Sequence, residues 1–252
     1  MISLGLTLQR QVDSDVFLMW VGNLRRMPFL GPVYNGRSSY IAQARNIVVQ
    51  QFLAETEDPS RALLFWDADQ VPPVGLGDGT PFLEHVLDLE SQNLPAVGML
   101  YFRREQPFEP VAYTRDERAR YHHLTLEQMI PKLTVRGCYE VDAVGAGALL
   151  IQRRVLEHLQ RVKAPRPIFE TPMVDVEKEP GLAGLSWTED TFFCYELQEL
   201  GYKIWLDTRG ESAHIAEIPI NARHYLPAHG WMSGRSAEPA ARGERRIWLP
   251  GE

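Results

Sequence analysis

Residues 62–66 form a continuous apolar run, Ala-Leu-Leu-Phe-Trp, and two aspartates, Asp67 and Asp69, follow shortly after it. A short run without polar alternation is typical of a strand that is buried on both faces, as in a parallel sheet covered by helices. Ligands in such sheets bind outside the carboxyl ends of the strands. The run therefore predicts a covered parallel sheet, with two acidic side chains at the edge where a ligand is expected.

Strand and helix patterns alternate on both sides of this run. Residues 2–8 predict a first strand, and apolar residues at helical spacing predict a helix from Ser38 or Ser39 to about Glu55. Further helices are predicted at residues 14–24, 81–92, 125–130, 153–160 and 188–200, and further strands at residues 96–102, 141–144, 148–151 and 202–206. Irregular chain is expected at residues 27–34 (or a short edge strand there), over the rest of 103–135, and at 163–186, which we expect to form a loop over a site. The alternation predicts an α/β fold with a Rossmann-like, mostly parallel central sheet and helices on both faces.

Composition limits the classes of protein to which this chain can belong. Its 252 residues are compatible with one large α/β domain and leave little room for two. A net charge of −7 gives no long-range attraction to nucleic acid or to an anionic membrane, so either partner would need a local basic patch. The two cysteines form no CxxC pair and no disulfide framework. Because a signal-peptide pattern and a membrane-spanning run of roughly 20 apolar residues are also absent from the sequence, we expect a cytoplasmic protein.

Asp67 and Asp69 are the strongest candidates for a metal site. Alternate residues at a strand end can both turn toward one ion where the backbone bends, and their hard oxygen atoms suit Mg²⁺ or Mn²⁺. Such a cation would neutralise a departing diphosphate. The structural alternative is a solvated turn, because aspartate favours turns. The buried strand that runs into the pair favours the metal site.

His214 is a candidate third ligand. A neutral imidazole binds Mn²⁺ well, and the residue lies just past the strand that is predicted to end at Leu206. The structural alternative is a partly buried histidine with a hydrogen-bond partner, which is a common role for a single histidine.

Glu189 and Asp190 lie at the start of the helix predicted at residues 188–200. A carboxylate there, across the site from a metal, could accept a proton from an acceptor hydroxyl. Ser186 and Glu189 have the spacing of a capping box, and acids in a first helical turn complement the helix dipole, so Glu189 has a structural explanation. We therefore favour Asp190 as the general base.

Two further groups of residues are candidates for ligand contacts. Gly145, Ala146 and Gly147 follow a predicted strand, and their small side chains would permit the close approach of a sugar or an acceptor. Packing at a strand bulge is the structural alternative for them. Arg45 and Asn46 lie on the predicted second helix, from which they could reach a nucleotide.

Five segments follow one another in a distinctive order along residues 38–215. They are ARN at 44–46, LLFWDAD at 63–69, VDAVGAGALLI at 141–151, TEDTFFCYELQELGYKIWLDT at 188–208 and AHI at 213–215. This order resembles that of the GT-A glycosyltransferases near family 2, especially the short versions common in phage and bacterial genomes. The Asp-Ala-Asp segment alone is unspecific, whereas the run from Glu189 to His214 is considerably more specific.

The resemblance implies a GT-A fold, a nucleotide-sugar donor such as a UDP- or GDP-sugar, and a Mn²⁺ or Mg²⁺ cofactor. It implies a single domain over residues 1–225, in which residues 1–102 bind the nucleotide sugar and residues 103–225 bind the acceptor. Residues 226–252 would form an extension, which we expect to be flexible or dependent on a partner. The acceptor is left open between a glycan, a protein, a small molecule and a modified DNA base.

The same resemblance assigns roles to individual residues. Asp67 and Asp69 would form the metal and diphosphate site, with His214 as the late metal-binding histidine. Asp190 would be the base, with Glu189 beside it, which predicts inversion at the anomeric carbon. The segment from Gly145 to Gly147 would contact the donor sugar and the acceptor. The first strand lacks the usual polar pattern after it, so only Thr7 and Gln9 are candidates for recognising the base.

Three other functions fit parts of the sequence. In a phosphohydrolase of the HAD type, Asp67 would be the nucleophile and Asp69 the acid, but the later acids here open a helix and a histidine follows them. A nucleotidyltransferase would use the cation in the same way. A third alternative is a protein that binds nucleotide sugars without turning them over.

Overall fold

The computed structural model describes residues 1–8, 30–55, 60–73, 76, 80–118, 120–172, 187–215 and 219–220. Gln9, the helix predicted at residues 14–24 and the extension predicted at residues 226–252 lie outside these described residues. Within the described part of the chain, no helix is long and apolar enough to cross a bilayer.

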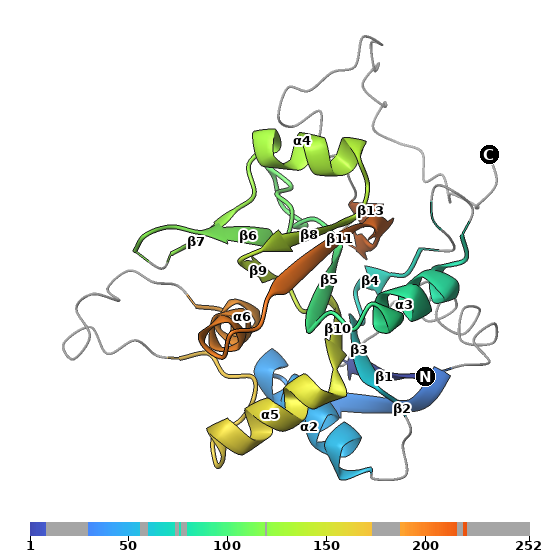
Figure 1. Cartoon of the computed structure of the whole chain (residues 1–252), viewed down its shortest axis with the longest axis vertical. Helices are drawn as coiled ribbons and strands as arrows, with labels where there is room; N and C mark the ends of the chain where they lie inside the picture. Colours follow the sequence, from blue (N-terminus) through green and yellow to red (C-terminus); the bar gives the residue numbers. More distant parts are fainter. Residues whose placement is uncertain are drawn as a thin grey trace.

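A seven-stranded sheet runs through the centre of the molecule, in the strand order β2-β1-β3-β10-β5-β11-β8 (Figure 1). Its strands are β1 (Ile2–Leu8), β2 (Leu30–Arg37), β3 (Ala62–Asp67), β5 (Ala96–Leu100), β8 (Cys138–Val141), β10 (Ala148–Gln152) and β11 (Ile204–Glu211). β1 pairs in parallel with β2 and β3, and β5 pairs in parallel with β11. β10 and β8 run antiparallel to their neighbours. The other five strands therefore point in one direction.

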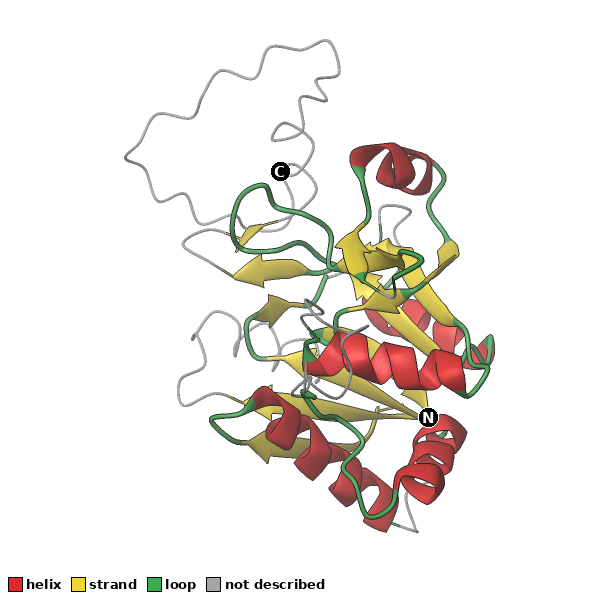
Figure 2. Ribbon diagram, turned by 90° about the vertical axis from the view of Figure 1, so that its left-hand side faces the viewer, coloured by secondary structure: helices red, strands yellow, loops and turns green. Residues whose placement is uncertain are grey.

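Helices cover both faces of this sheet (Figures 1 and 2). The helices are α2 (Ile41–Ala54), α3 (Phe82–Ser91), α4 (Leu126–Thr134), α5 (Arg153–Lys163) and α6 (Glu189–Glu199). α2, α5 and α6 share a hydrophobic core with one face of the sheet, and α3 shares a second core with the other face. The predicted α/β fold, with a Rossmann-like, mostly parallel central sheet and helices on both faces, is confirmed.

The central strand β3 shows why the apolar run predicts this architecture. Leu63 and Phe65 pack into the core beneath α2 and α5, whereas Leu64 and Trp66 pack into the core beneath α3. All residues from 62 to 66 are at most 2% exposed. Successive side chains of a strand point to opposite faces, so a strand covered on both faces needs an unbroken apolar run.

Two small sheets flank the central one. Their strands are β4 (Gln70–Val71), β12 (Ala213–Ile215) and β13 (Pro219–Ile220) in one, and β6 (Ala112–Arg115), β7 (Tyr121–His123) and β9 (Ala143–Val144) in the other. The prediction that residues 103–135 are irregular apart from one short helix is therefore wrong. β6 and β7 are short and rich in polar residues, and β6 also pairs with β9, far along the chain. A local apolar pattern cannot reveal such strands, because their stability comes from cross-strand partners.

The strand predicted at residues 141–144, with residues 148–151 as its continuation, is divided in the structure. Val141 ends β8 in the central sheet, and residues 143–144 form β9 in a small sheet. β10 then returns to the central sheet between β3 and β5. The stretch at residues 27–34, predicted as irregular or a short edge strand, overlaps β2, which forms an edge of the central sheet.

Candidate functional site

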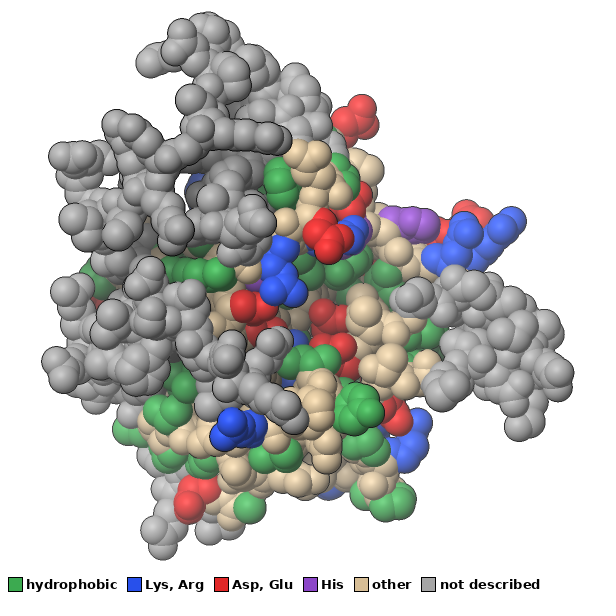
Figure 3. Space-filling view, turned by 180° about the vertical axis from the view of Figure 1, so that it is seen from behind, with side chains coloured by type: hydrophobic (Ala, Val, Ile, Leu, Met, Phe, Trp, Pro, Cys, Tyr) green, Lys and Arg blue, Asp and Glu red, His purple; other side chains and the backbone are tan. Residues whose placement is uncertain are grey.

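A cavity of about 800 Å³ opens at the carboxyl ends of β1, β2, β3 and β5. Its walls come from strand ends, from the start of α2, from the start of α6 and from β12. Figure 3 shows acidic side chains gathered in a hollow near the middle of one face, with basic side chains beside them. The lining residues are Thr7, Arg37, Ser38, Ser39, Ile41, Ala44, Arg45, Asp67, Ala68, Asp69, Gln70, Tyr101, Arg104, Glu189, Asp190 and His214. We call this cavity the pocket.

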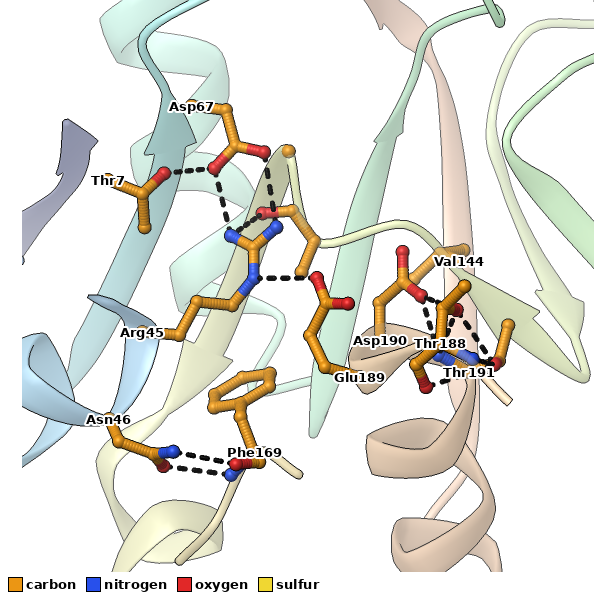
Figure 4. Close-up of polar contacts among 12 residues, drawn as sticks. Thr7, Arg45, Asn46, Asp67, Val144, Phe169, Thr188, Glu189, Asp190 and Thr191 are labelled. Carbon is orange, nitrogen blue, oxygen red and sulfur yellow. Dashed lines mark hydrogen bonds and ion pairs between the residues drawn. The ribbon is translucent and has the colours of Figure 1, made fainter. Parts of the chain in front are cut away.

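Asp67 lies at the end of β3 and is held from two sides (Figure 4). The hydroxyl of Thr7, its neighbour across the β1–β3 pair, donates to Oδ1. Arg45 donates from Nη1 to Oδ1 at 2.9 Å and from Nη2 to Oδ2 at 3.1 Å. Both carboxylate oxygens therefore already accept hydrogen bonds within the protein, although a carboxylate can accept more than these three.

Arg45 connects three segments of the chain at the back of the pocket. Besides Asp67, its guanidinium donates to the carbonyl of Ala146 at 3.1 Å and to Glu189 Oε1 at 3.4 Å. Its side chain is only 3% exposed, whereas an arginine on a helix is normally solvated. Burial alone would lower the pKa of Arg45, but the facing carboxylate of Asp67 raises this pKa above its ordinary value. The guanidinium remains charged and neutralises acids of the pocket.

Asn46, which the sequence suggested as a nucleotide contact, instead anchors a loop. Its side-chain amide donates to the carbonyl of Phe169 at 2.6 Å, and its side-chain oxygen accepts from the Phe169 backbone N–H at 2.9 Å (Figure 4). The Phe169 ring stacks on Phe193 of α6. Asn46 thus fixes the segment after α5 against α2 and α6.

Asp69 and His214 are 145 residues apart in sequence and meet at the edge of the pocket. β12 pairs with β4, which places His214 opposite Gln70, and the backbone N–H of Ile215 donates to the Asp69 carbonyl at 2.8 Å. His214 Nε2 then lies 3.4 Å from Asp69 Oδ2. On the other side of the ring, His214 Nδ1 lies 2.9 Å from the carbonyl of Phe102. A carbonyl only accepts hydrogen bonds, so Nδ1 carries a proton, and Nε2 faces Asp69 as a donor in the protonated ring or with its lone pair in the neutral ring.

The neighbours of Asp69 favour the ionised form of its carboxyl group. Burial would raise the pKa of this carboxyl, but the hydrogen bond and charge of His214, together with Arg104, lower the pKa below its ordinary value. Arg104 Nη1 lies 3.2 Å from Asp69 Oδ2. An ionised carboxylate therefore faces the second ring nitrogen of His214.

Glu189 and Asp190 lie in the first turn of α6, on the opposite wall. The cap of this helix is Thr188, whose side chain accepts the N–H of Thr191 in a capping box. The predicted capping box of Ser186 and Glu189 is therefore wrong, because Glu189 is the first residue of the helix rather than the third. Asp190 Oδ1 accepts from the Thr188 hydroxyl and from the Thr191 N–H (Figure 4). These two bonds fix the orientation of its carboxylate.

Glu189 is largely buried. Its side chain is 12% exposed and pairs with Arg45. Burial and the charge of Asp190 raise the pKa of Glu189 above its ordinary value. Its position beside Arg45 makes Glu189 a partner of that guanidinium, and leaves Asp190 as the carboxylate better placed for proton transfer.

Gly145, Ala146 and Gly147 are buried behind the pocket rather than among its lining residues. A Cβ added to Gly145 would lie 2.0 Å from the Tyr101 hydroxyl, and one added to Gly147 would lie 3.0 Å from the same atom. Ala146 contributes the carbonyl that holds Arg45. Packing against Tyr101 is thus enough to explain why these positions are small, as the structural alternative proposes.

Arg37, Tyr101 and Arg104 are among the lining residues that the sequence interpretation missed. Arg37 is the last residue of β2, and Tyr101 directly follows β5. The rule that selects Asp67, namely the carboxyl end of a parallel strand, would also select these two. Arg104 lies in a loop, and no local pattern marks it.

Among the described residues, no group of three or more His, Cys, Asp or Glu side chains converges on one metal position. Asp69 and His214 bring a carboxylate oxygen and an imidazole nitrogen together, and both atom types suit Mn²⁺. The pocket also holds four carboxylates and three guanidinium groups. These side chains together carry a small net negative charge. A bound divalent cation would make this net charge positive, which favours an anionic ligand.

No protein-family model matches the sequence, and it matches no curated protein. Among solved structures, the fold is similar to A197 from STIV, with a TM-score of 0.54, 17% identity and coverage of 85% of each chain. GalNAc-T7, crystallised with UDP, GalNAc and Mn²⁺, has a TM-score of 0.47 and 12% identity over 90% of this chain and 47% of that chain. A 4-diphosphocytidyl-2C-methyl-D-erythritol synthase from Anaerococcus prevotii DSM 20548 has a TM-score of 0.42 and 11% identity over 91% of this chain and 97% of that chain. The likeness to A197 shows a shared fold and nothing about a ligand.

Proposed function

We propose that the chain is a metal-dependent glycosyltransferase of the GT-A type, which moves a sugar from a UDP- or GDP-sugar to an acceptor hydroxyl with inversion. One observation carries the proposal. Acids from the end of β3, a histidine from β12 and two acids from the start of α6 line a single pocket at the carboxyl ends of parallel strands. This combination of a cation-binding pair and a separate, oriented carboxylate is what transfer from a diphosphate donor requires.

Asp69 and His214 fit the cation in this proposal. The Asp69 carboxylate is ionised, and the hydrogen bond from Nδ1 to the Phe102 carbonyl orients the His214 ring, as is common for metal-binding histidines. Asp67 contributes charge at the edge of the same site while Arg45 and Thr7 hold it in place. When bound, a divalent cation would neutralise the diphosphate of the donor.

Asp190 is the general base in this proposal. Thr188 and Thr191 fix its carboxylate through Oδ1. The base takes the proton of the acceptor hydroxyl as that oxygen attacks the anomeric carbon. Attack from the side opposite the diphosphate inverts the configuration at that carbon. Glu189 supports the site by pairing with Arg45, and takes no proton from the acceptor.

The geometry of Asp67 argues against a phosphohydrolase of the HAD type. That function would make Asp67 a free nucleophile, but both of its oxygens accept hydrogen bonds from the buried Arg45. A carboxylate that is held in this way is a weaker nucleophile, because its charge is already stabilised.

The test combines donor binding with product analysis. A panel of UDP-, GDP- and dTDP-sugars, each with Mn²⁺ or with EDTA, identifies the donor by the rise in melting temperature that ligand binding causes. The donor is then incubated with glycan, protein, small-molecule and DNA acceptors, and the release of nucleoside diphosphate is measured. A nucleotidyltransferase would instead release pyrophosphate from a nucleoside triphosphate and a sugar phosphate.

Asp190→Asn tests the role of the base. The amide keeps the shape of the side chain but cannot accept the proton, so we expect turnover to fall by about 100- to 10,000-fold. Donor binding should remain, since Asp190 makes no part of the cation pair. Wild-type turnover in the variant, or retention of the anomeric configuration in the product, would show that Asp190 is not the base.

A further inference from the structure

Two cationic or potentially cationic groups converge on one oxygen of Asp69. His214 Nε2 lies 3.4 Å from Asp69 Oδ2, and Arg104 Nη1 lies 3.2 Å from the same atom. The guanidinium therefore contacts the same carboxylate oxygen that faces His214 Nε2. Any cation that bridges Asp69 and His214 must compete with Arg104 for that oxygen.

Arg104 belongs to a turn that is built independently of Asp69. The backbone N–H of Arg103 donates to the Glu109 carbonyl at 2.9 Å, and that of Phe108 donates to the Glu105 carbonyl at 2.8 Å. The base of the same turn supplies the Phe102 carbonyl that holds His214. The histidine is thus fixed by the turn's backbone, whereas Arg104 reaches Asp69 only through its long side chain.

Exposure distinguishes Arg104 from the other arginine that binds a pocket aspartate. The Arg104 side chain is 52% exposed, whereas that of Arg45 is 3% exposed. An exposed ion pair contributes little free energy, and a guanidinium on a flexible stem can leave without disturbing the fold. Arg45, by contrast, cannot leave Asp67 without exposing a buried charge.

We propose that Arg104 is an internal counter-ion that occupies Asp69 while no metal is present and is displaced when a divalent cation binds between Asp69 and His214. This inference rests on the cation site of the proposed function. Arg104 holds the Asp69 carboxylate in place, and at the same time weakens the affinity for the metal.

The displaced guanidinium has a second role in this proposal. Arg104 lines the pocket, so it stays close to a bound diphosphate once it has left Asp69. A diphosphate attracts Arg104 away from Asp69, and a cation on Asp69 releases Arg104 toward the diphosphate. Metal and nucleoside diphosphate should therefore bind with positive coupling through this residue.

Mn²⁺ binding to the metal-free protein tests the proposal without any assay of turnover. The affinity is measured by titration calorimetry, and by the electron paramagnetic resonance signal of free Mn²⁺, for the wild type, Arg104→Met and Arg104→Lys. Removal of the competing charge should tighten Mn²⁺ binding by roughly three- to tenfold in Arg104→Met. Arg104→Lys keeps the charge and should remain close to the wild type.

Arg103→Met is the matched control. Arg103 precedes Arg104 in the same turn, is 42% exposed, and pairs with Glu109 at 3.2 Å rather than with a pocket aspartate. Its removal should leave Mn²⁺ affinity unchanged. Equal tightening in both methionine variants would overturn the proposal, because it would reflect net charge alone. Unchanged or weaker binding in Arg104→Met would also overturn it.

Addition of UDP or GDP tests the coupling. Each diphosphate should tighten Mn²⁺ binding more in the wild type than in Arg104→Met, and an equal gain in the two proteins would contradict the second role. If none of the four proteins binds Mn²⁺, with or without a diphosphate, the cation site of the proposed function fails, and this inference fails with it. Clear binding without an effect of Arg104 rejects the inference alone.

Discussion

The guanidinium of Arg45 lies 2.9 Å from Asp67 and 3.4 Å from Glu189, and its side chain is 3% exposed. It therefore lies between two partly buried acids of the pocket. Bidentate contact with a carboxylate needs the planar fork of arginine, which lysine cannot reproduce. At the scale of single residues, we expect the charge balance of the pocket to depend on this side chain.

Arg45→Met should destabilise the protein by about 3–5 kcal/mol at neutral pH, because it leaves two largely buried carboxylates without their counter-ion. Burial and Asp190 already raise the pKa of Glu189. A carboxyl whose pKa is higher in the folded than in the unfolded state reduces the stability of the fold as the pH rises. The loss of stability in Arg45→Met should therefore be smallest near pH 4.5 and increase toward pH 8. Urea unfolding at the two pH values measures this. Arg45→Lys should lose less stability at pH 8 than Arg45→Met. A loss of stability that does not depend on pH would contradict this account.

Single residues also show where sequence reasoning succeeds at the candidate site. Asp67, Asp69 and Asp190 could be selected from the sequence, because they stand at a strand end and at a helix start, where side chains face a ligand. The burial of Arg45 could not be predicted, since an arginine on a helix is normally solvated and its partners lie on β3 and α6. The role of Asn46 could not be predicted for a similar reason, because its hydrogen-bond partner Phe169 is 123 residues away in the sequence.

α6 places the proposed base, and its first turn depends on its cap. Thr188 accepts the N–H of Thr191 and donates to Asp190 Oδ1. One side chain therefore both starts the helix and orients the carboxylate. α4 begins with the same type of capping box, formed by Thr125 and Gln128, and none of these residues lines the pocket. Thr125 can therefore serve as a control for the effect that the loss of a cap has on stability.

At the scale of elements, Thr188→Ala and Thr125→Ala should each destabilise the protein by about 1 kcal/mol through the loss of a cap. Thr188→Ala should also lower turnover by roughly ten- to hundredfold, because Asp190 loses a fixed hydrogen bond and its orientation. Melting curves and steady-state kinetics of the two variants separate these effects. Equal turnover in the two variants would mean that Thr188 acts on stability alone.

Long elements with a clear apolar period were predictable, and short ones were not. The buried strand β3 and the helices α2, α3, α5 and α6 follow from patterns that local sequence contains. β6, β7 and β9 are two to four residues long, and their pairing depends on chain segments that no local window includes. The cap of α6 was misplaced by two residues because Ser186 and Glu189 match the same spacing rule as the true cap.

The whole fold brings together groups that the chain keeps far apart. His214 reaches Asp69 because β12 pairs with β4, across 145 residues of sequence. The strand order of the central sheet places the ends of β1, β3 and β5 around one cavity, and α6 closes its far wall. The sequence indicated that His214 could bind a metal from its place just past a predicted strand and from the order of the motifs. Its orientation by the Phe102 carbonyl is a property of the assembled molecule.

The most direct test is calorimetric titration of the donor identified from the UDP-, GDP- and dTDP-sugar panel, in Mn²⁺ and in EDTA, for the wild type and Asp69→Asn. The proposed cation site predicts that Mn²⁺ tightens donor binding to the wild type by at least about tenfold, since the cation joins the diphosphate to Asp69 and His214. Asp69→Asn should lose most of this gain. Equal donor affinity in Mn²⁺ and in EDTA for the wild type would contradict the central claim that these two residues hold a cation for a nucleotide sugar.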